Sequence, residues 1–208
     1  MASMIHDLGA AAIVPGRAFR RLETDPKTLR KGIRAIVFIG FLYTISAAGL
    51  AAAGALLPAP AFLPLPPYNY YFFEMLFALP LVCAAWLAGA GGGNLLASLL
   101  GGRGSAKTAA GAWAFAFAVP SLLMWLPHAV FSGFLILGIS QKEFMSYTAE
   151  PGVWRTGFFA WQGLALVLLV LGSVKAASVG RALKPVPAAL SGLLAAGLFA
   201  LVLGFAIR

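Results

Sequence analysis

Charged residues are scarce in this sequence: Asp, Glu, Lys and Arg make up 10% of its 208 residues, whereas 61% of the residues are hydrophobic. A soluble domain carries about 25% charged residues, and apolar runs of about twenty residues indicate transmembrane helices. The apolar runs leave no room for a separate soluble domain. The composition therefore excludes a soluble globular protein and predicts a polytopic membrane protein.

Cysteine and histidine are also scarce. The single cysteine, Cys83, excludes an intrachain disulfide and a thiolate metal site, and inside an apolar run it is interpreted as a small packing group. The two histidines, His6 and His128, lie far apart in the sequence. The sequence thus predicts no metal and no cofactor. It also lacks a cluster of nucleophile, base and orienting acid, so we do not expect an enzyme.

Five apolar segments are long enough to cross about 30 Å of hydrocarbon as helices. Asp25-Pro26 is typical of a helix start, because Asp can cap free amides and Pro suits the first turn. Pro80 is expected to kink the second helix, while Pro120 and Pro127 are expected to bend or break the third. The predicted fold is all-α: a five-helix bundle over residues 26–208, with spans at about residues 35–57, 72–100, 108–136, 156–174 and 186–207.

The N-terminal region is strongly basic. Seven of the fifteen lysines and arginines lie before or at the start of the first span, at Arg17, Arg20, Arg21, Lys27, Arg30, Lys31 and Arg34. Anionic lipid headgroups explain this cluster better than nucleic acid does, since each basic residue near a membrane contributes about 1 kcal/mol.

Residues 1–25 are interpreted as a cytoplasmic or interfacial segment. A short helix opening at Pro15 would place Ala18, Phe19 and Leu22 on one face, which is typical of a helix lying on a membrane. A flexible polar tail accounts for the same residues equally well, and the sequence leaves both alternatives open.

The remaining basic residues predict an orientation. Together with the N-terminal segment, the loops between spans two and three and between spans four and five carry twelve basic residues. The other side carries Lys142, Arg155 and Arg208. The positive-inside rule then places the N-terminus in the cytoplasm and the C-terminus outside. The richness in Ala and Gly favours a prokaryote, and hence its cytoplasmic membrane.

Two ionisable residues are predicted within or near the apolar slab: Glu74, about one turn inside the outer interface, and His128, directly after Pro127. Such residues are costly in a bilayer and count as hypotheses for a functional site. Each also has a structural alternative. Glu74 could reach headgroups or aromatic hydroxyls, and His128 could donate to a carbonyl that proline leaves free.

Glycine-rich and small-residue patterns complete the sequence features. Gly101-Gly102-Arg103-Gly104-Ser105 is predicted as a turn, with Ser105 capping the third span. Ala106 stands where a phosphate loop needs glycine, which excludes nucleotide binding.

Small residues recur every fourth position at Gly40, Thr44, Ala48 and Ala52, and at Gly192, Ala196, Ala200 and Gly204. They predict close helix packing, within the bundle or between two copies.

These features resemble the prokaryotic branch of the Yip domain family, the Ypt/Rab-interacting membrane proteins. The resemblance covers residues 12–207 and depends on Pro15–Leu22 before Asp25-Pro26, the Leu95–Ser105 segment and Pro120. It implies five transmembrane helices, a cytoplasmic N-terminus and no catalytic residues. The chain lacks the long N-terminal region and the Asp-Leu-Tyr-Gly-Pro type motif of the eukaryotic trafficking factors, so GTPase binding is not implied.

Two functions are compatible with the sequence. The first is a non-enzymatic membrane scaffold that contacts itself or a partner membrane protein through its helices. The alternative is a small permease or channel component that moves protons, ions or small solutes past Glu74 and His128. A continuous polar cavity that holds both residues would favour transport, while a dry bundle with Glu74 facing headgroups would count against it.

Overall fold

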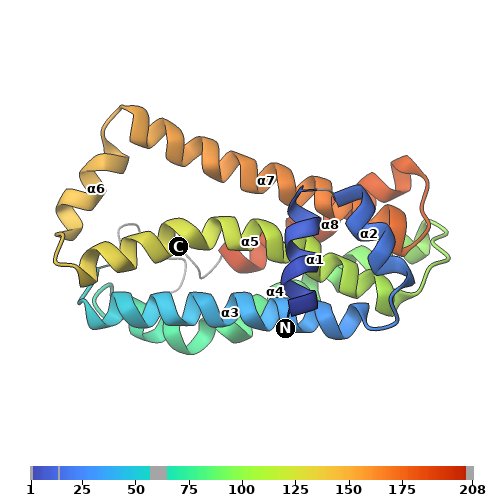
Figure 1. Ribbon diagram of the computed structural model, residues 1–208, viewed down its shortest axis with the longest axis horizontal. Coiled ribbons are helices and arrows are strands. Elements are labelled where there is room, and N and C mark those ends of the chain that lie inside the picture. Colours follow the sequence, from blue (N-terminus) through green and yellow to red (C-terminus); the bar gives the residue numbers. More distant parts are fainter. Residues whose placement is uncertain (1, 14, 57–64, 205–208) are drawn as a thin grey trace.

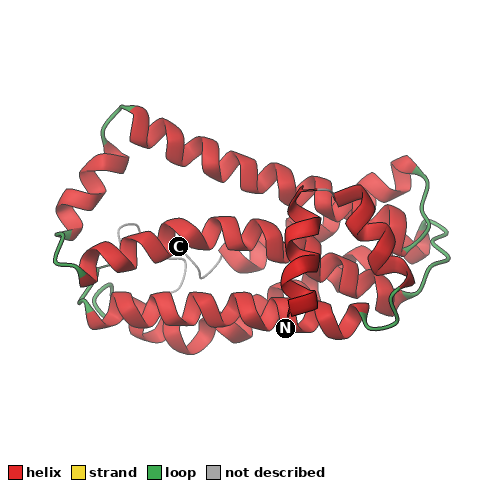
Figure 2. Ribbon diagram, in the orientation of Figure 1, coloured by secondary structure: helices red, strands yellow, loops and turns green. Residues whose placement is uncertain are grey.

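A computed structural model describes residues 2–13, 15–56 and 65–204, and within these residues it contains helices and loops but no strand (Figure 2). The helices are α1 (Ala2–Ile13), α2 (Pro15–Thr24), α3 (Thr28–Ala52), α4 (Tyr70–Leu99), α5 (Ala106–Ile136), α6 (Gln141–Ala149), α7 (Val153–Gly180) and α8 (Pro185–Gly204). Five of them, α3, α4, α5, α7 and α8, are long and apolar enough to cross a membrane. The all-α fold with five membrane-crossing helices is therefore confirmed.

The structure differs from the sequence prediction in several details. Two short helices, α1 and α2, precede the first span instead of one, and the polar loop before α7 contains α6. The α5 helix continues through Pro120 and Pro127, so the predicted break is absent. The predicted ends of the first span, at residue 57, and of the fifth, at residue 207, lie outside the described residues.

The five long helices run lengthwise, while α1 lies across them (Figure 1). The α5 helix packs against α3 and α7, and α4 packs against α3 and α8, which in turn contacts α7. The α5 helix supplies three of the largest fully buried side chains of the core, Trp113, Phe115 and Phe117. The sequence of α5 explains this position, because small alanines alternate with these rings and allow close approach on every side.

The basic residues gather at one end of the bundle, which we call the basic end. It contains the starts of α3 and α5, the α4–α5 turn and the α7–α8 loop, on the right of Figure 1. Twelve of the fifteen lysines and arginines belong to these segments, to α2 and to the last part of α7, which carries Lys175. Lys142 and Arg155 lie at the opposite end, on α6 and at the start of α7. The cytoplasmic location of the basic end stays a prediction from the positive-inside rule.

Tryptophan side chains connect α5 to its neighbours. Four indole N–H groups donate to carbonyls of another helix: Trp86 to Ala110 (3.1 Å), Trp113 to Ser173 (3.2 Å), Trp125 to Leu42 (3.0 Å) and Trp161 to Leu123 (2.8 Å). The last bond is the most informative. Leu123 lies four residues before Pro127, and because proline has no N–H, the Leu123 carbonyl lacks its usual helical donor. Trp161 therefore supplies the donor that Pro127 removes, which lets α5 continue.

The small-residue stripes pack within the chain. A Cβ on Gly40 would lie 3.0 Å from Leu79 Cα, so α3 approaches α4 closely there. A Cβ on Gly192 would lie 2.5 Å from Val174 Cα, so α8 approaches α7 in the same way. The first of the two predicted uses, packing inside the bundle, accounts for both positions.

Candidate functional site

Three long helices bring Glu74 and His128 into one group of side chains. Tyr43 comes from α3, Tyr71 and Glu74 come from α4, and His128 comes from α5. The His128 ring centroid lies 5.9 Å from that of Tyr43 and 6.1 Å from that of Tyr71. Glu74 lies three residues after Tyr71 on the same buried face of α4. We call these four residues the intramembrane cluster.

Helical periodicity places the members of the cluster. On α4, Tyr71, Glu74 and Ala78 are three and four residues apart and all are buried. On α5, polar or indole side chains recur with the same spacing along one face, at Ser121, Trp125, His128 and Ser132. This face meets α3: Tyr43 Oη donates to Ser121 O (3.2 Å), and Trp125 Nε1 donates to Ser46 Oγ (2.9 Å). This polar periodicity, visible in the sequence but not among the features that led to the site prediction, identifies the side of α5 that carries His128.

The cluster contains polar atoms without partners. Glu74 is 0% exposed, and neither of its carboxylate oxygens has a hydrogen-bond partner among the described residues. Both ring nitrogens of His128 are buried and likewise unpartnered within that part of the chain. An unpartnered carboxylate inside a low-dielectric bundle is costly, so such a group is retained where it binds a proton or another cation.

The contacts of Glu74 and His128 do not match the structural roles that the sequence left open for them. Glu74 does not reach toward headgroups, because it is fully buried. His128 does not donate to the carbonyl left free by Pro127, because Trp161 occupies that acceptor. Both residues lie on long apolar helices and have buried polar atoms, while their depth in the bilayer stays a prediction. The sequence did not show that they share a site with Tyr43 and Tyr71, which no motif marks.

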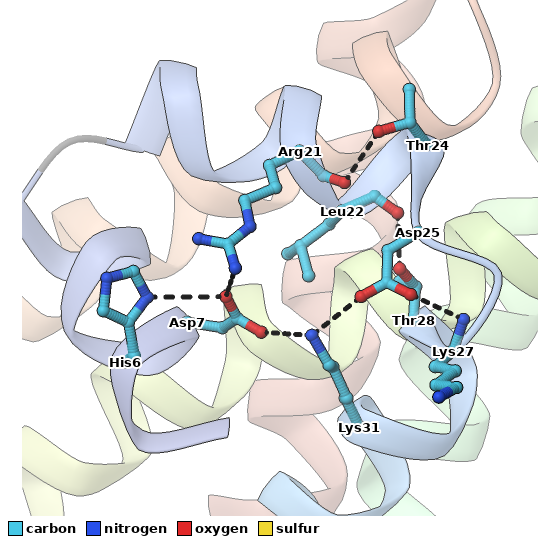
Figure 3. Close-up of polar contacts among 9 residues, drawn as sticks. All are labelled: His6, Asp7, Arg21, Leu22, Thr24, Asp25, Lys27, Thr28 and Lys31. Carbon is cyan, nitrogen blue, oxygen red and sulfur yellow. Dashed lines mark hydrogen bonds and ion pairs between the residues drawn. The ribbon is translucent and has the colours of Figure 1, made fainter. Parts of the chain in front are cut away.

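The predicted lipid-facing cations divide into two groups. The side chains that are exposed or half-buried at the basic end are Arg17, Arg20, Arg21, Lys27, Arg30 and Arg34. Lys31 differs: its side chain is 14% exposed, and its Nζ donates to Asp7 Oδ2 (2.8 Å) and lies 2.7 Å from Asp25 Oδ2 (Figure 3). The expectation that Lys31 meets headgroups is therefore wrong, because two carboxylates hold it inside the protein.

This ion cluster fastens the N-terminal helices to the bundle. Asp7, on α1, is 4% exposed and also lies 3.9 Å from Arg21 Nη2 on α2. Thr28 Oγ1 donates to Leu22 O at the junction of α2 and α3 (Figure 3). The apolar face of α2, with Ala18, Phe19 and Leu22, is buried against the protein instead of lying on lipid. Sequence reasoning missed the cluster, although Asp7 is an acid within an otherwise apolar stretch.

Asp25 makes this attachment sensitive to acid. The hydrogen bond with the Lys31 ammonium, and a second one from the Lys27 backbone N–H (2.8 Å), lower the pKa of Asp25 below its usual value. A carboxyl whose pKa is depressed on folding contributes stability above its unfolded pKa, about 3.9, and that stability is lost as pH falls through the folded pKa.

We therefore expect Asp25→Asn to lower the Tm at pH 7, and the difference from the unchanged protein to vanish at a pH below the folded pKa. Thermal unfolding in nanodiscs between pH 7 and pH 3 measures this effect. Glu23→Gln, a change at an exposed acid on α2, is the matched control and should leave the pH dependence unchanged. A Tm difference for Asp25→Asn that persists unchanged to pH 3 would contradict the assignment.

The glycine-rich turn is a docking point for Arg181. Arg181, 7% exposed at the end of α7, donates from Nη1 to Gly104 O (2.6 Å) and from Nη2 to Gly102 O (3.2 Å) and Ser98 Oγ (2.6 Å). Its own carbonyl accepts from the backbone N–H of Arg103 (3.0 Å). The predicted turn and its cap are confirmed, with Ser105 Oγ accepting from Thr108 N (3.5 Å).

The described residues contain no group of three or more His, Cys, Asp or Glu side chains that could hold a metal ion. Comparison with known proteins adds no assignment: no family model matches the sequence, and neither the curated proteins nor the solved structures compared with it gave a match. The resemblance to the Yip domain family stays a prediction from the sequence.

Proposed function

We propose that this integral membrane protein is a small, non-enzymatic transport protein that binds a proton within the bilayer at Glu74 and His128. The observation that supports this proposal is the intramembrane cluster. It places a fully buried carboxyl group and an imidazole, both without hydrogen-bond partners in the described residues, between three membrane-crossing helices. Intramembrane acid and histidine side chains arranged in this way serve as proton relays in pumps and transporters.

One proton can move between Glu74 and His128 without changing the net charge of the pair. The Glu74 carboxylate takes up a proton and becomes a neutral acid. Once helix movement brings the two groups within hydrogen-bond distance, which they do not have here, transfer of that proton to a ring nitrogen of His128 restores the carboxylate and forms an imidazolium, so the pair stays neutral in both arrangements. The buried rings of Tyr43 and Tyr71 lie beside the His128 ring. For the proton to continue, α3, α4 and α5 must move relative to one another, as the helices of alternating-access transporters do.

A proteoliposome assay tests the proposal. Purified protein is reconstituted with a pH-sensitive dye inside the vesicles, and an imposed pH gradient drives proton entry while valinomycin and potassium clamp the voltage. We expect entry faster than in protein-free vesicles, and a decrease of at least about tenfold in the protein-dependent rate for Glu74→Gln and for His128→Ala.

The chain offers matched controls for both variants. Glu143→Gln changes an exposed acid on α6, and His6→Ala changes the other histidine, whose side chain is 66% exposed. Both controls should retain the unchanged rate. Equal rates in all proteins and in empty vesicles would reject proton transport, whereas loss of flux in the controls as well would show that the assay reports folding alone.

A scaffold or interaction protein is the second candidate, and the first half of α7 favours it. Its large apolar side chains are strongly exposed there, at Val153, Trp154 and Phe159, and Figure 1 shows this half diverging from the other long helices. Such a surface suits a helix of a second copy or of a partner membrane protein. Absence of flux together with disulfide crosslinking at Phe159→Cys, in a Cys83→Ser background, would support this function instead.

A further inference from the structure

A mostly apolar groove lies where the α1–α2 unit crosses α5 and α7, near the basic end. Its volume is about 320 Å³, at the lower end of the range for ligand pockets. The residues that define it are Gly16 and Phe19 from α2, Phe115 and Val119 from α5, and Leu168 and Lys175 from α7. None of the four residues of the intramembrane cluster lines it, so a ligand in this groove is independent of proton transport.

Charge in the groove is confined to one position. Among the described residues that line it, Lys175 is the one ionisable side chain. Its ammonium group has no carboxylate partner within the described part of the chain, in contrast to Lys31. A single cation in the lining of an apolar groove matches a ligand with an anionic head and a hydrocarbon tail. Arg17, next to Gly16 in the chain, adds positive charge nearby.

The depth of Lys175 agrees with such a ligand. Lys175 lies five residues before the end of α7, hence roughly 8 Å from it at 1.5 Å per residue. The 28 residues of α7 exceed the about 20 needed to span the hydrocarbon, so its ends reach the headgroup region. Lys175 therefore lies near the boundary between acyl chains and phosphates, where lysines bind headgroups.

We propose that this groove binds one anionic phospholipid, with an acyl chain between α2, α5 and α7 and its phosphate on Lys175. The groove exists because α1 and α2 lie across the bundle, where the Asp7–Lys31 ion pair holds them. The bound lipid fills the space beneath α2 and joins the basic face of α2 to the membrane through a specific contact. This differs from the general attraction of the exposed arginines for anionic headgroups.

Native mass spectrometry of delipidated protein in detergent, titrated with phosphatidylglycerol or phosphatidylcholine, tests the proposal. We expect one phosphatidylglycerol to bind more tightly than the rest and more tightly than phosphatidylcholine. Lys175→Gln should weaken this binding about fivefold and reduce the preference for the anionic lipid, the change expected from one basic residue. Lys184→Gln, at an exposed position of the basic end outside the groove, should leave it unchanged.

A second pair of variants tests the groove itself. Gly16 lines the groove and a Cβ there meets nothing within 4 Å, so Gly16→Leu adds a side chain at the groove without a clash at Cβ, and we expect it to abolish the tight site by competing with the acyl chain. Gly9 is equally free of neighbours but does not line the groove, so Gly9→Leu is the matched control. Unchanged binding by Gly16→Leu, equal binding of both lipids, or displacement of phosphatidylglycerol by equimolar free fatty acid would overturn the proposal.

Discussion

Replacing Glu74 with methionine is expected to raise the Tm of the purified protein. Glu74 is 0% exposed and its two carboxylate oxygens have no partners in the described residues. An unpartnered buried polar group costs about 1–3 kcal/mol, and an apolar side chain of similar length removes that cost. At about 2–4 °C per kcal/mol for a chain of this size, the gain is about 2–12 °C in a nanodisc melt.

The same substitution separates a functional role from a structural one. Active sites commonly hold groups that lower stability, so a variant that melts later but no longer transports protons fits a functional carboxyl group. Glu143→Met changes an exposed position of α6. It should alter the free energy of unfolding by no more than about 0.5 kcal/mol, so its Tm shift should be correspondingly small. A Tm that falls for Glu74→Met but not for Glu143→Met would mean that Glu74 supports the fold, and the intramembrane cluster would lose its basis.

Gly104→Ala is expected to give the largest loss of stability among single-methyl additions in the described turns. The new Cβ would overlap Gly180 O and lie 2.9 Å from Arg181 Cα, and both are backbone atoms that cannot rotate away. The α7–α8 loop must then withdraw, which breaks the bonds from Arg181 to Gly102 and Gly104. Overpacking costs about 1–3 kcal/mol and each lost charged hydrogen bond about 1.5–3 kcal/mol.

We therefore expect a decrease of about 3 kcal/mol or more, seen as a Tm lower by at least about 6 °C. Gly91→Ala is the matched control, since a Cβ there meets nothing within 4 Å and alanine favours the α4 helix by up to about 1 kcal/mol. If Gly104→Ala and Gly91→Ala melt at the same temperature, the turn does not need glycine at position 104. The docking of Arg181 would then contribute little to stability.

The sequence predicted the spans because each depends on local properties. Hydropathy over twenty residues and the Ser105 cap act within one helix, and both appear in the structure. The Asp25-Pro26 start is wrong by two residues: α3 begins at Thr28 without a side-chain cap, and Asp25 Oδ1 accepts instead from the Lys27 N–H in the turn before it. The break expected at Pro127 did not appear, since its remedy comes from Trp161 on α7, distant in the sequence. A missing donor can be recognised in the sequence, whereas the residue that replaces it depends on how the helices pack.

The candidate site was only half predictable for the same reason. The cost of an ionisable residue in lipid identifies Glu74 and His128 individually. Their neighbours Tyr43 and Tyr71 belong to the cluster because α3, α4 and α5 meet there, and tyrosines are common in such segments. Lys31 shows the opposite error: its charge predicts headgroup contact, but Asp25 is six residues away in the turn before α3, and Asp7 approaches it when α1 folds back onto α3.

The position of α8 has a consequence for the order in which the chain assembles. It is the last of the long helices to be synthesised, yet it packs against α4, the second, where Gly89 and Gly93 approach Ala195 closely. Until α8 leaves the ribosome, these glycines have no α8 neighbour on that side. This face of α4 is therefore uncovered until α8 is synthesised, and the packing of α8 completes the bundle.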